Sequence, residues 1–360
     1  MSTTTAPQPA VSKSTATSSP APSSLAPSSL APESKVPESL RLATMTPTVI
    51  QDVGEKPLIL YSKVRTPLAS LSFLRRSLAL VELAMISYND EAEASRAAAA
   101  IGFPEAQLLD QDGSQAYRFR NEHDVVLACR GTEPNEWNDI QADANAVMAV
   151  VGTIGNVHSG FNREVEDLWP LLESVLKDSQ QPAWFCGHSL GGAMATICAY
   201  RCKTSSISTN PQELHTYGSP RVGCRRWIRH AEVEHYRWVH NNDVVTRVPP
   251  AWMGYRHCGN EVYLDRHGRI RKLTGLWRSR DRWRGLIAGL FQWKIDLLAD
   301  HSMKLYAHRI AAAVDEENVS LATGRAAADD DDLVIPESES CQAEGSELQP
   351  GTKGAQSTPV

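Results

Sequence analysis

Residues 183–203 read AWFCGHSLGGAMATICAYRCK. The first four form a short apolar run, which is typical of a strand covered on both faces, and the segment from 190 to 203 reads as a helix. Between them stands the sequence GHSLG, a G-x-S-x-G match at a strand-to-helix junction. This context predicts a nucleophile elbow, in which a tight turn leaves the serine exposed above the edge of a sheet.

Each residue of the motif has a role in such an elbow. A Cβ at Gly187 or Gly191 would collide with the neighbouring strand or helix, and the strain falls on Ser189, the candidate nucleophile. The N–H of Leu190 is a free donor at the helix start, where an oxyanion would develop. We expect His188 to pack or hydrogen-bond below the serine. The alternative interpretation is a Gly–Ser turn without chemistry.

The chain around this stretch alternates between strand and helix patterns. Apolar residues at helical spacing mark the segments 70–88 and 92–100, and Pro170 should kink or split a helix over 161–178. Such alternation predicts an α/β fold with a mostly parallel sheet and helices on both faces. The expected strands lie at 115–120, 123–130, 183–186, 213–218 and 235–240, with a further helix around 223–233.

Composition divides the chain of 360 residues into three parts. Residues 1–45 are rich in Pro, Ser, Thr and Ala, and residues 324–360 hold eight acids and two bases, so both ends are predicted to be disordered tails. A single α/β domain is expected over residues 46–323. The net charge of −6 conceals a basic stretch, because residues 221–309 hold 18 bases and 8 acids.

Cysteine spacing and hydropathy restrict the location and the cofactors. None of the seven cysteines forms a C-x-x-C pair or alternates with His at zinc spacing, which favours free thiols in a reducing compartment. The first residues lack the features of a Sec signal peptide, and no apolar run is long enough to span a bilayer. We therefore expect a cytoplasmic protein without a metal or an organic cofactor.

Four short motifs occur in a family-like order. They are RGT at 130–132, VHSGF at 157–161, GHSLGGA at 187–193 and DHSMKLY at 300–306. Together they resemble the class 3 lipases, the fungal-lipase-like branch of the α/β-hydrolases. The resemblance implies an α/β-hydrolase fold and hydrolysis of glycerolipid esters.

The family order of catalytic residues is Ser, Asp, His, and it points to two further positions. Asp243 follows the expected strand at 235–240, where a loop carboxylate should orient the base, and His301 is the late histidine that matches the family pattern. The resemblance also implies that Thr132 supplies the second oxyanion donor. Alternatively, Thr132 caps the helix that follows, and both roles can coexist. The remaining candidates are expected to be structural or lack the right context: His158, His257, His267, His308, Asp265, Asp281, Asp296 and Asp300.

The segment after Thr132 is predicted to be an amphipathic helix. Its apolar residues fall on one helical face, as in the lid that covers the serine in secreted relatives. The alternative is a fixed helix packed on the core. The face consists of Trp137, Ile140, Ala144, Val147, Met148 and Val151.

Residues 269–284 form a basic arm, with seven bases and one acid. Such an arm suits an anionic lipid surface, which its side chains Trp277, Arg278, Arg282 and Trp283 could contact. A solvated basic face is the competing interpretation. Nucleic-acid binding is not expected, because no recognised module surrounds the arm.

These features together predict a serine ester hydrolase, a lipase or carboxylesterase that acts on lipid or other carboxylic esters through an acyl-enzyme on Ser189. Two alternatives remain open. One is a phospholipase A-type hydrolase on anionic membranes, and the other is a non-catalytic, membrane-peripheral scaffold on the same fold.

Overall fold

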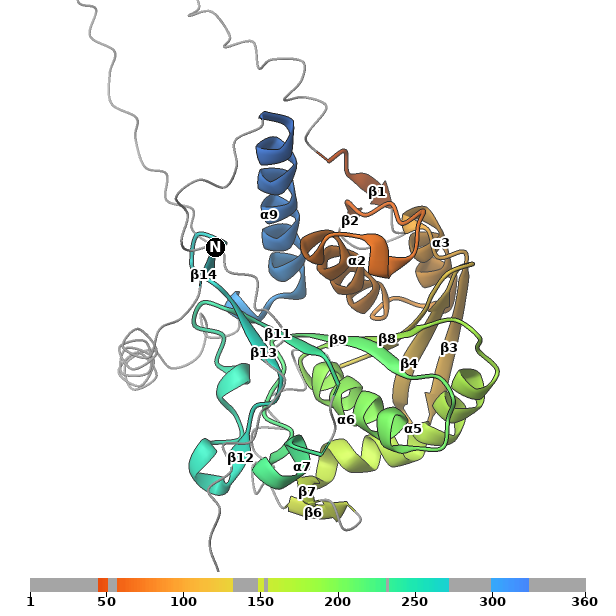
Figure 1. Cartoon of the computed structure of the whole chain (residues 1–360), viewed down its shortest axis with the longest axis vertical. Helices are drawn as coiled ribbons and strands as arrows, with labels where there is room; N and C mark the ends of the chain where they lie inside the picture. Colours follow the sequence, from red (N-terminus) through yellow and green to blue (C-terminus); the bar gives the residue numbers. More distant parts are fainter. Residues whose placement is uncertain are drawn as a thin grey trace, which may run out of the picture.

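The computed structural model describes residues 45–50, 57–131, 155–230, 233–271 and 299–323, and the backbone alone at 148–151. An eight-stranded sheet forms its centre, with the strand order β14-β13-β11-β9-β8-β5-β4-β3 (Figure 1). Five neighbouring strands, from β13 to β5, are parallel, whereas β3, β4 and β14 are antiparallel at the edges. The bounds are β3 (Glu105–Gln111), β4 (Ser114–Arg120), β5 (Val125–Cys129), β8 (Ala183–His188), β9 (Pro211–Tyr217), β11 (His235–His240), β13 (Asn260–Leu264) and β14 (Ile270–Arg271).

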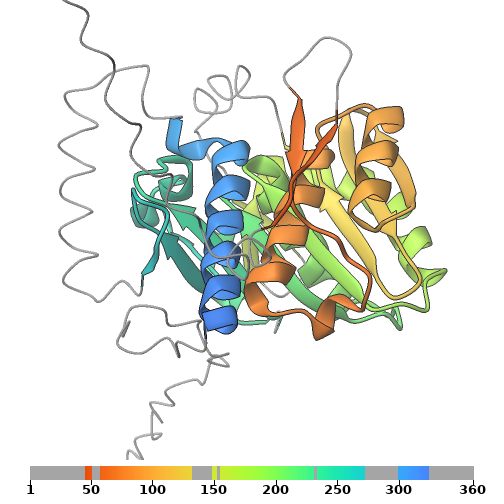
Figure 2. The same cartoon turned by 90° about the horizontal axis from the view of Figure 1, so that it is seen from above.

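Helices cover both faces of this sheet, as the alternating pattern predicts. Helices α2, α3 and α9 lie on one face and α5 and α6 on the other, which Figures 1 and 2 show from two directions. The predicted helix with Pro170 is continuous, so the proline does not split it. The helices are α2 (Phe73–Ile86), α3 (Glu91–Ile101), α5 (Ser159–Lys177), α6 (Leu190–Thr204), α7 (Arg225–Ile228) and α9 (Met303–Thr323).

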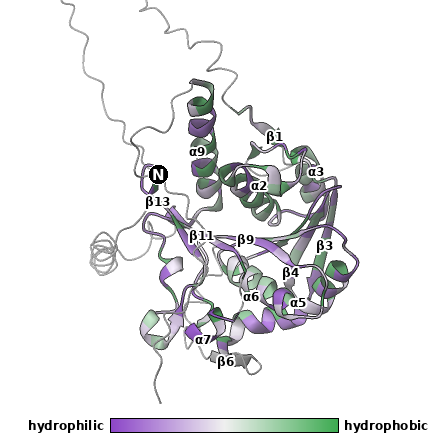
Figure 3. Ribbon diagram, viewed as in Figure 1, coloured by the Kyte–Doolittle hydropathy of each residue, from purple (hydrophilic) through white to green (hydrophobic). Residues whose placement is uncertain are grey.

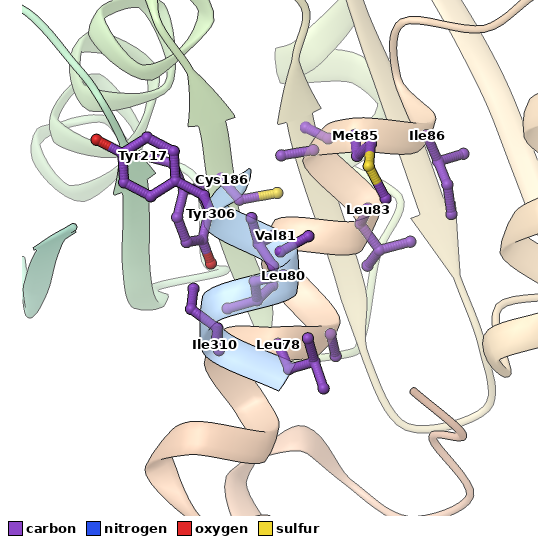
Figure 4. Packing of buried hydrophobic residues seen from close by; sticks show 14 of the residues in the cluster. Leu78, Leu80, Val81, Leu83, Met85, Ile86, Cys186, Tyr217, Tyr306 and Ile310 are labelled. Atoms are coloured by element: carbon purple, nitrogen blue, oxygen red, sulfur yellow. The ribbon is translucent and has the colours of Figure 1, made fainter. Parts of the chain in front are cut away.

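The apolar run of β8 divides the core into two clusters. Trp184 and Cys186 join the cluster under α2 and α9, while Ala183 and Phe185 join the cluster under α5 and α6. Period-two alternation sends neighbouring side chains to opposite faces, so a strand covered on both sides is apolar throughout. Figure 4 shows the first cluster, in which residues of α2 meet Ile310 of α9.

A second, four-stranded sheet has the order β12-β10-β7-β6 and lies beside α7. Its strands are β6 (Met148–Val151), β7 (Gly155–His158), β10 (Gly223–Cys224) and β12 (Tyr255–Arg256). A short hairpin of β1 (Thr48–Ile50) and β2 (Leu58–Leu60) precedes α2. Single 3-10 turns stand at η1 (Leu68–Ser70), η2 (Val245–Arg247), η3 (Ala251–Met253) and η4 (Ala299–His301).

Two expectations from the sequence are corrected here. The predicted helical face of the lid segment ends too late, because Met148 and Val151 belong to β6, which pairs antiparallel with β7. The residues MAVV are apolar and partly β-branched, so an available partner strand outweighs their helical spacing. The helix expected around 223–233 covers only Arg225–Ile228, because Gly223 and Cys224 pair with β12.

Glu82 of α2 is a fully buried carboxyl group. Its two oxygens accept hydrogen bonds from the backbone N–H groups of Tyr61 at 2.5 Å and Ser62 at 3.0 Å, just after β2. Burial raises the pKa of Glu82 from 4.5 to about 7, although the two hydrogen bonds oppose that shift. The contact ties the segment after β2 to the middle of α2.

Across the segments that the structure describes, no helix has the length and apolar character that crossing a bilayer requires. The same segments contain no group of three or more His, Cys, Asp or Glu side chains that could hold a metal ion.

Candidate active site

Ser189 occupies the tight turn between β8 and α6. Its backbone has φ 56° and ψ −128°, a left-handed conformation that costs a non-glycine residue about 1–3 kcal/mol. The Ser189 N–H donates to the carbonyl of Tyr217 at 3.0 Å, which fixes the turn to the end of β9. The strained serine at a strand-to-helix junction is the geometry that the G-x-S-x-G context predicts.

Two glycines make this turn possible. A Cβ on Gly187 would lie 2.3 Å from the carbonyl oxygen of Gly191, and a Cβ on Gly191 would lie 2.2 Å from the carbonyl oxygen of Cys129. Both carbonyl groups belong to the backbone, which cannot rotate away. The first turn of α6 is thereby packed against the end of β5.

The groups expected to bind an oxyanion are described only in part. Leu190 is the first residue of α6, so its N–H is among those that the helix itself leaves without a carbonyl partner. Gly131, beyond the end of β5, packs on the elbow, since a Cβ there would lie 2.8 Å from the carbonyl oxygen of His188. Thr132 is the next residue and lies outside the described residues.

Asp243 and His301 form a buried pair. Asp243 follows β11, and both its carboxylate oxygens lie near His301 Nδ1, at 3.0 and 2.9 Å. The two residues are 1% and 6% exposed. Because Asp243 engages Nδ1, the other ring nitrogen, Nε2, is the one available for proton exchange with a nucleophile.

Gly218 brings this pair next to the elbow. It has φ +61° and directly follows Tyr217, whose carbonyl accepts the Ser189 N–H. A Cβ on Gly218 would lie 2.6 Å from Asp243 Oδ2 and 2.8 Å from His301 Nδ1. The end of β9 therefore contacts the serine turn on one side and the Asp–His pair on the other. A glycine at the end of the strand expected at 213–218 is the sequence feature that could have indicated this close approach.

Tyr306 of α9 supports the carboxylate of Asp243. Its hydroxyl donates to Asp243 Oδ2 at 2.7 Å and accepts from the backbone N–H of His240 at 2.9 Å. Burial and the neighbouring Asp243 raise the pKa of Tyr306 well above its ordinary value, so the hydroxyl keeps its proton. The backbone N–H of Val245 also donates to Asp243, at 3.0 Å. The carboxylate of Asp243 is thus held by Tyr306, Val245 and His301.

His188 joins the elbow to the histidine segment. Burial and the nearby His301 lower the pKa of His188 well below its ordinary value, so its ring is neutral. Nε2 lies 2.7 Å from the carbonyl oxygen of His301 and must be the protonated nitrogen, which leaves Nδ1 to accept from the hydroxyl of Tyr88 at 3.3 Å. This arrangement agrees with a hydrogen-bonding role below the serine, and Tyr88 at the end of α2 is an addition that the sequence did not suggest.

Asp300, adjacent to His301, faces another loop. Its Oδ2 accepts from Asn241 Nδ2 at 2.9 Å and from the backbone N–H of Asn242 at 3.3 Å, and its Oδ1 lies 3.4 Å from His240 Nδ1. Asp300 therefore connects the segment of His301 with the segment that precedes Asp243.

The other candidate histidines and acids take structural positions. His158 caps α5 by accepting from Phe161 N at 3.5 Å, and His257 Nε2 lies 2.6 Å from the carbonyl oxygen of Thr246. Asp265 accepts backbone hydrogen bonds in the turn between β13 and β14. The following expected site or surface residues lie outside the described residues: Thr132, Trp137, Ile140, Ala144, Val147, Trp277, Arg278, Asp281, Arg282, Trp283 and Asp296. Of Met148 the structure describes only the backbone.

Comparison of the sequence with known proteins finds a matching family. Residues 126–253 match the family model "Lipase (class 3)". The chain is 35% identical over 117 residues to the secreted mono- and diacylglycerol lipase 1 of Fusarium solani, covering 30% of this chain and 34% of that protein. It is 31% identical over 169 residues to a lipase of Rhizomucor miehei, covering 44% and 46% of the two. The chain thus spans a third to a half of the length of these relatives.

Among solved structures, the Rhizomucor miehei triacylglyceride lipase aligns with a TM-score of 0.48 and 21% identity, over 54% of this chain and 82% of that one. The family match contains the elbow and Asp243, and His301 follows it in the chain. Residues 126–253 thus match the class 3 lipase family, and the mostly parallel sheet with helices on both faces has the arrangement of an α/β-hydrolase.

Proposed function

We propose that this protein is a serine ester hydrolase whose catalytic residues are Ser189, His301 and Asp243. The observation that carries the proposal is the buried Asp243–His301 pair, which lies against Gly218, the residue after the Tyr217 whose carbonyl accepts the Ser189 N–H. A serine alone is a weak nucleophile, and an oriented imidazole is the group that activates it.

The reaction would proceed through an acyl-enzyme. His301 Nε2 takes the proton of Ser189 as the serine oxygen attacks the ester carbonyl carbon, and the oxyanion is bound by the N–H groups of Leu190 and Thr132. His301 then gives that proton to the departing alcohol oxygen. A water molecule then attacks the acyl carbon while His301 takes its proton. His301 gives that proton to the Ser189 oxygen as the bond between this oxygen and the acyl carbon breaks, and the carboxylic acid leaves. Asp243 stays ionised and holds the imidazole.

Glycerolipid esters are the proposed substrates. Three of the relatives that match in sequence are named as a lipase and as mono- and diacylglycerol lipases, which supports this class. Because the chain spans only part of those relatives, the choice among triglyceride, partial glyceride and phospholipid belongs to the proposal. A phospholipase A-type activity stays the second candidate, and the exposed arginines described below favour it.

A scaffold without activity is the least supported alternative. Burying a carboxylate against an imidazole costs desolvation energy and adds little stability. Asp243 is nevertheless buried beside His301 and is contacted by Tyr306, Val245 and Gly218, which a catalytic role explains. A cytoplasmic location is likewise a proposal, and it is supported by the six cysteines of the described segments, all of which are free thiols. The lid and the basic arm of residues 269–284 remain predictions.

Covalent labelling tests the proposed function. A fluorophosphonate probe should label the wild-type chain at Ser189 and should leave Ser189→Ala unlabelled. Ser189→Ala should also lower kcat on a p-nitrophenyl ester by several orders of magnitude, because members of a triad act as a unit. Thermal unfolding checks that the variant is folded. A folded Ser189→Ala variant with activity within tenfold of wild type would overturn the assignment.

A further inference from the structure

Trp252 is an exposed aromatic residue on η3. Its side chain is 84% exposed, which is the largest value for a bulky hydrophobic side chain in the described segments. The turn that carries it is well ordered by hydrogen bonds, since Met253 N donates to the carbonyl of Pro250 and Gly254 N to that of Ala251, both at 3.1 Å. Arg256 Nη1 also donates to the carbonyl of Ala251, at 2.5 Å. The fold thus presents an indole ring that it could have buried.

Exposed arginines lie on the elements that neighbour this turn. Strand β10 pairs with β12, which carries the exposed Arg256, and α7 contacts the same strand. Arg225 and Arg226 of α7 and Arg229, which follows it, are also exposed. The two stretches involved, residues 219–230 and 244–259, contain no Asp or Glu. With respect to the described residues, Arg225, Arg226 and Arg229 form no salt bridge. Figure 3 shows the hydrophilic colour of α7 at this corner. We call Arg225, Arg226, Arg229, Trp252 and Arg256 the Trp252 patch.

The Trp252 patch stands on two stretches that lead away from the candidate active site. One of its stretches follows Gly218 and the other follows Asp243, so both leave the carboxyl ends of neighbouring parallel strands, β9 and β11. Arg221 binds the two stretches together, because its backbone N–H donates to Val248 O at 2.7 Å and its Nη1 to Pro249 O at 2.8 Å. The patch therefore lies at the same edge of the sheet as Ser189, which stands at the carboxyl end of β8.

We propose that the Trp252 patch docks the protein on an anionic phospholipid surface. Arginine guanidinium groups bind headgroup phosphates, and an exposed indole flanked by Ala251 and Met253 partitions to the depth of the headgroups. An acidic nucleic-acid or protein partner would not require the apolar turn. This inference rests on the proposed function in one respect, which is that the docked surface supplies the ester substrate. Binding to the surface itself requires no hydrolysis.

Vesicle binding by the full chain tests this inference. The vesicles consist of ether-linked phosphatidylcholine, with or without ether-linked phosphatidylglycerol, and contain no ester to cleave. At low salt, wild type should bind the phosphatidylglycerol vesicles at least about tenfold more tightly, and 0.5 M salt should remove most of the difference. The double variant Arg225→Glu with Arg226→Glu should abolish the preference. Trp252→Ser should weaken binding to both vesicles about fivefold.

A matched control separates the patch from net charge. Lys63→Glu with Arg65→Glu changes the charge equally at exposed positions in the loop after β2, and it should keep the preference. Equal binding of wild type to both vesicles, an arginine double variant that still prefers phosphatidylglycerol, or a control that loses the preference would each overturn the proposal. Circular dichroism confirms that each variant is folded. Fluorophosphonate labelling of Ser189 is scored separately, so a failure of the proposed function is recognised as such.

Discussion

The proposed nucleophile and the proposed acid–base pair are held in place by different physical means. Backbone contacts fix Ser189, which has a strained φ and donates a hydrogen bond to Tyr217. A Cβ on either neighbouring glycine, Gly187 or Gly191, would lie within 2.3 Å of another backbone atom. Asp243 and His301 are fixed by side-chain hydrogen bonds that come from α9 and from the loop after β11. Backbone packing tolerates no added atom, whereas a hydrogen-bonded network loses its function in graded steps.

The largest effect is expected from adding one methyl group to the elbow. Gly191→Ala would place a Cβ 2.2 Å from the carbonyl oxygen of Cys129 and 2.7 Å from the nitrogen of Gly131, and neither group can move without shifting β5. We expect a loss of more than about 4 kcal/mol in unfolding free energy, together with loss of activity. Urea denaturation and fluorophosphonate labelling measure both quantities.

Gly160→Ala is the matched control for that substitution. A Cβ at Gly160 in α5 would meet only the ring of His158, at 3.3 Å, and alanine favours a helix. Its unfolding free energy should stay within about 1 kcal/mol of wild type. If Gly191→Ala were as stable as Gly160→Ala, the nucleophile would not depend on backbone packing in the way described.

The next effect concerns the acid. Asp243→Asn should lower kcat on a soluble ester by about 10⁴-fold with little change in KM, because an amide no longer fixes the imidazole tautomer and no longer stabilises its cation. The fold should persist, since Tyr306 and Val245 can still donate to the amide oxygen. Steady-state kinetics measure the effect, and Asp265→Asn, in the turn between β13 and β14, should be neutral. A neutral Asp243→Asn would mean that another group orients His301.

The smallest effect is expected at Tyr306, which touches the acid but not the reacting atoms. Tyr306→Phe leaves the buried carboxylate of Asp243 with one donor fewer, at a cost of about 2 kcal/mol in stability, and should lower kcat about tenfold at unchanged KM. Tyr117→Phe is the control, because its hydroxyl donates to the carbonyl of Asn89, away from the site. It should lose about 1 kcal/mol in stability with kcat unchanged. Equal kcat values for the two variants would make Tyr306 merely structural.

The strand, the tight turn and the helix around Ser189 could be predicted from the sequence for a local reason. The strand, the turn and the helix around Ser189 are consecutive, so their hydrophobic pattern and glycines can be interpreted together. The acid–base pair required a family resemblance, because Asp243 and His301 are 58 residues apart and nothing local links them. Tyr306 stands in the motif DHSMKLY, yet its hydrogen bond to Asp243 depends on where α9 packs.

Edge strands were the main elements that the sequence did not reveal. β3 reads EAQLLDQ, and most of its side chains are exposed or half-buried because β4 is its only neighbour in the described sheet. A strand of this kind has neither a buried run nor a clean alternation. The pairing of β6 with β7 could not be predicted, because the residues MAVV fit a helical face as well as a strand. Pairing with β7 determines that they form a strand.

The buried carboxyl of Glu82 makes the folding of this chain a proton-uptake reaction. Its pKa rises on folding from 4.5 to about 7 because burial disfavours the charged form, so between these pH values the folded chain keeps a proton that the unfolded chain releases. The stability that this group contributes is fully present below about pH 4.5 and is lost as the pH rises through 7, a change of about 3 kcal/mol. Acidification around neutrality therefore stabilises the folded chain by removing a buried charge from α2.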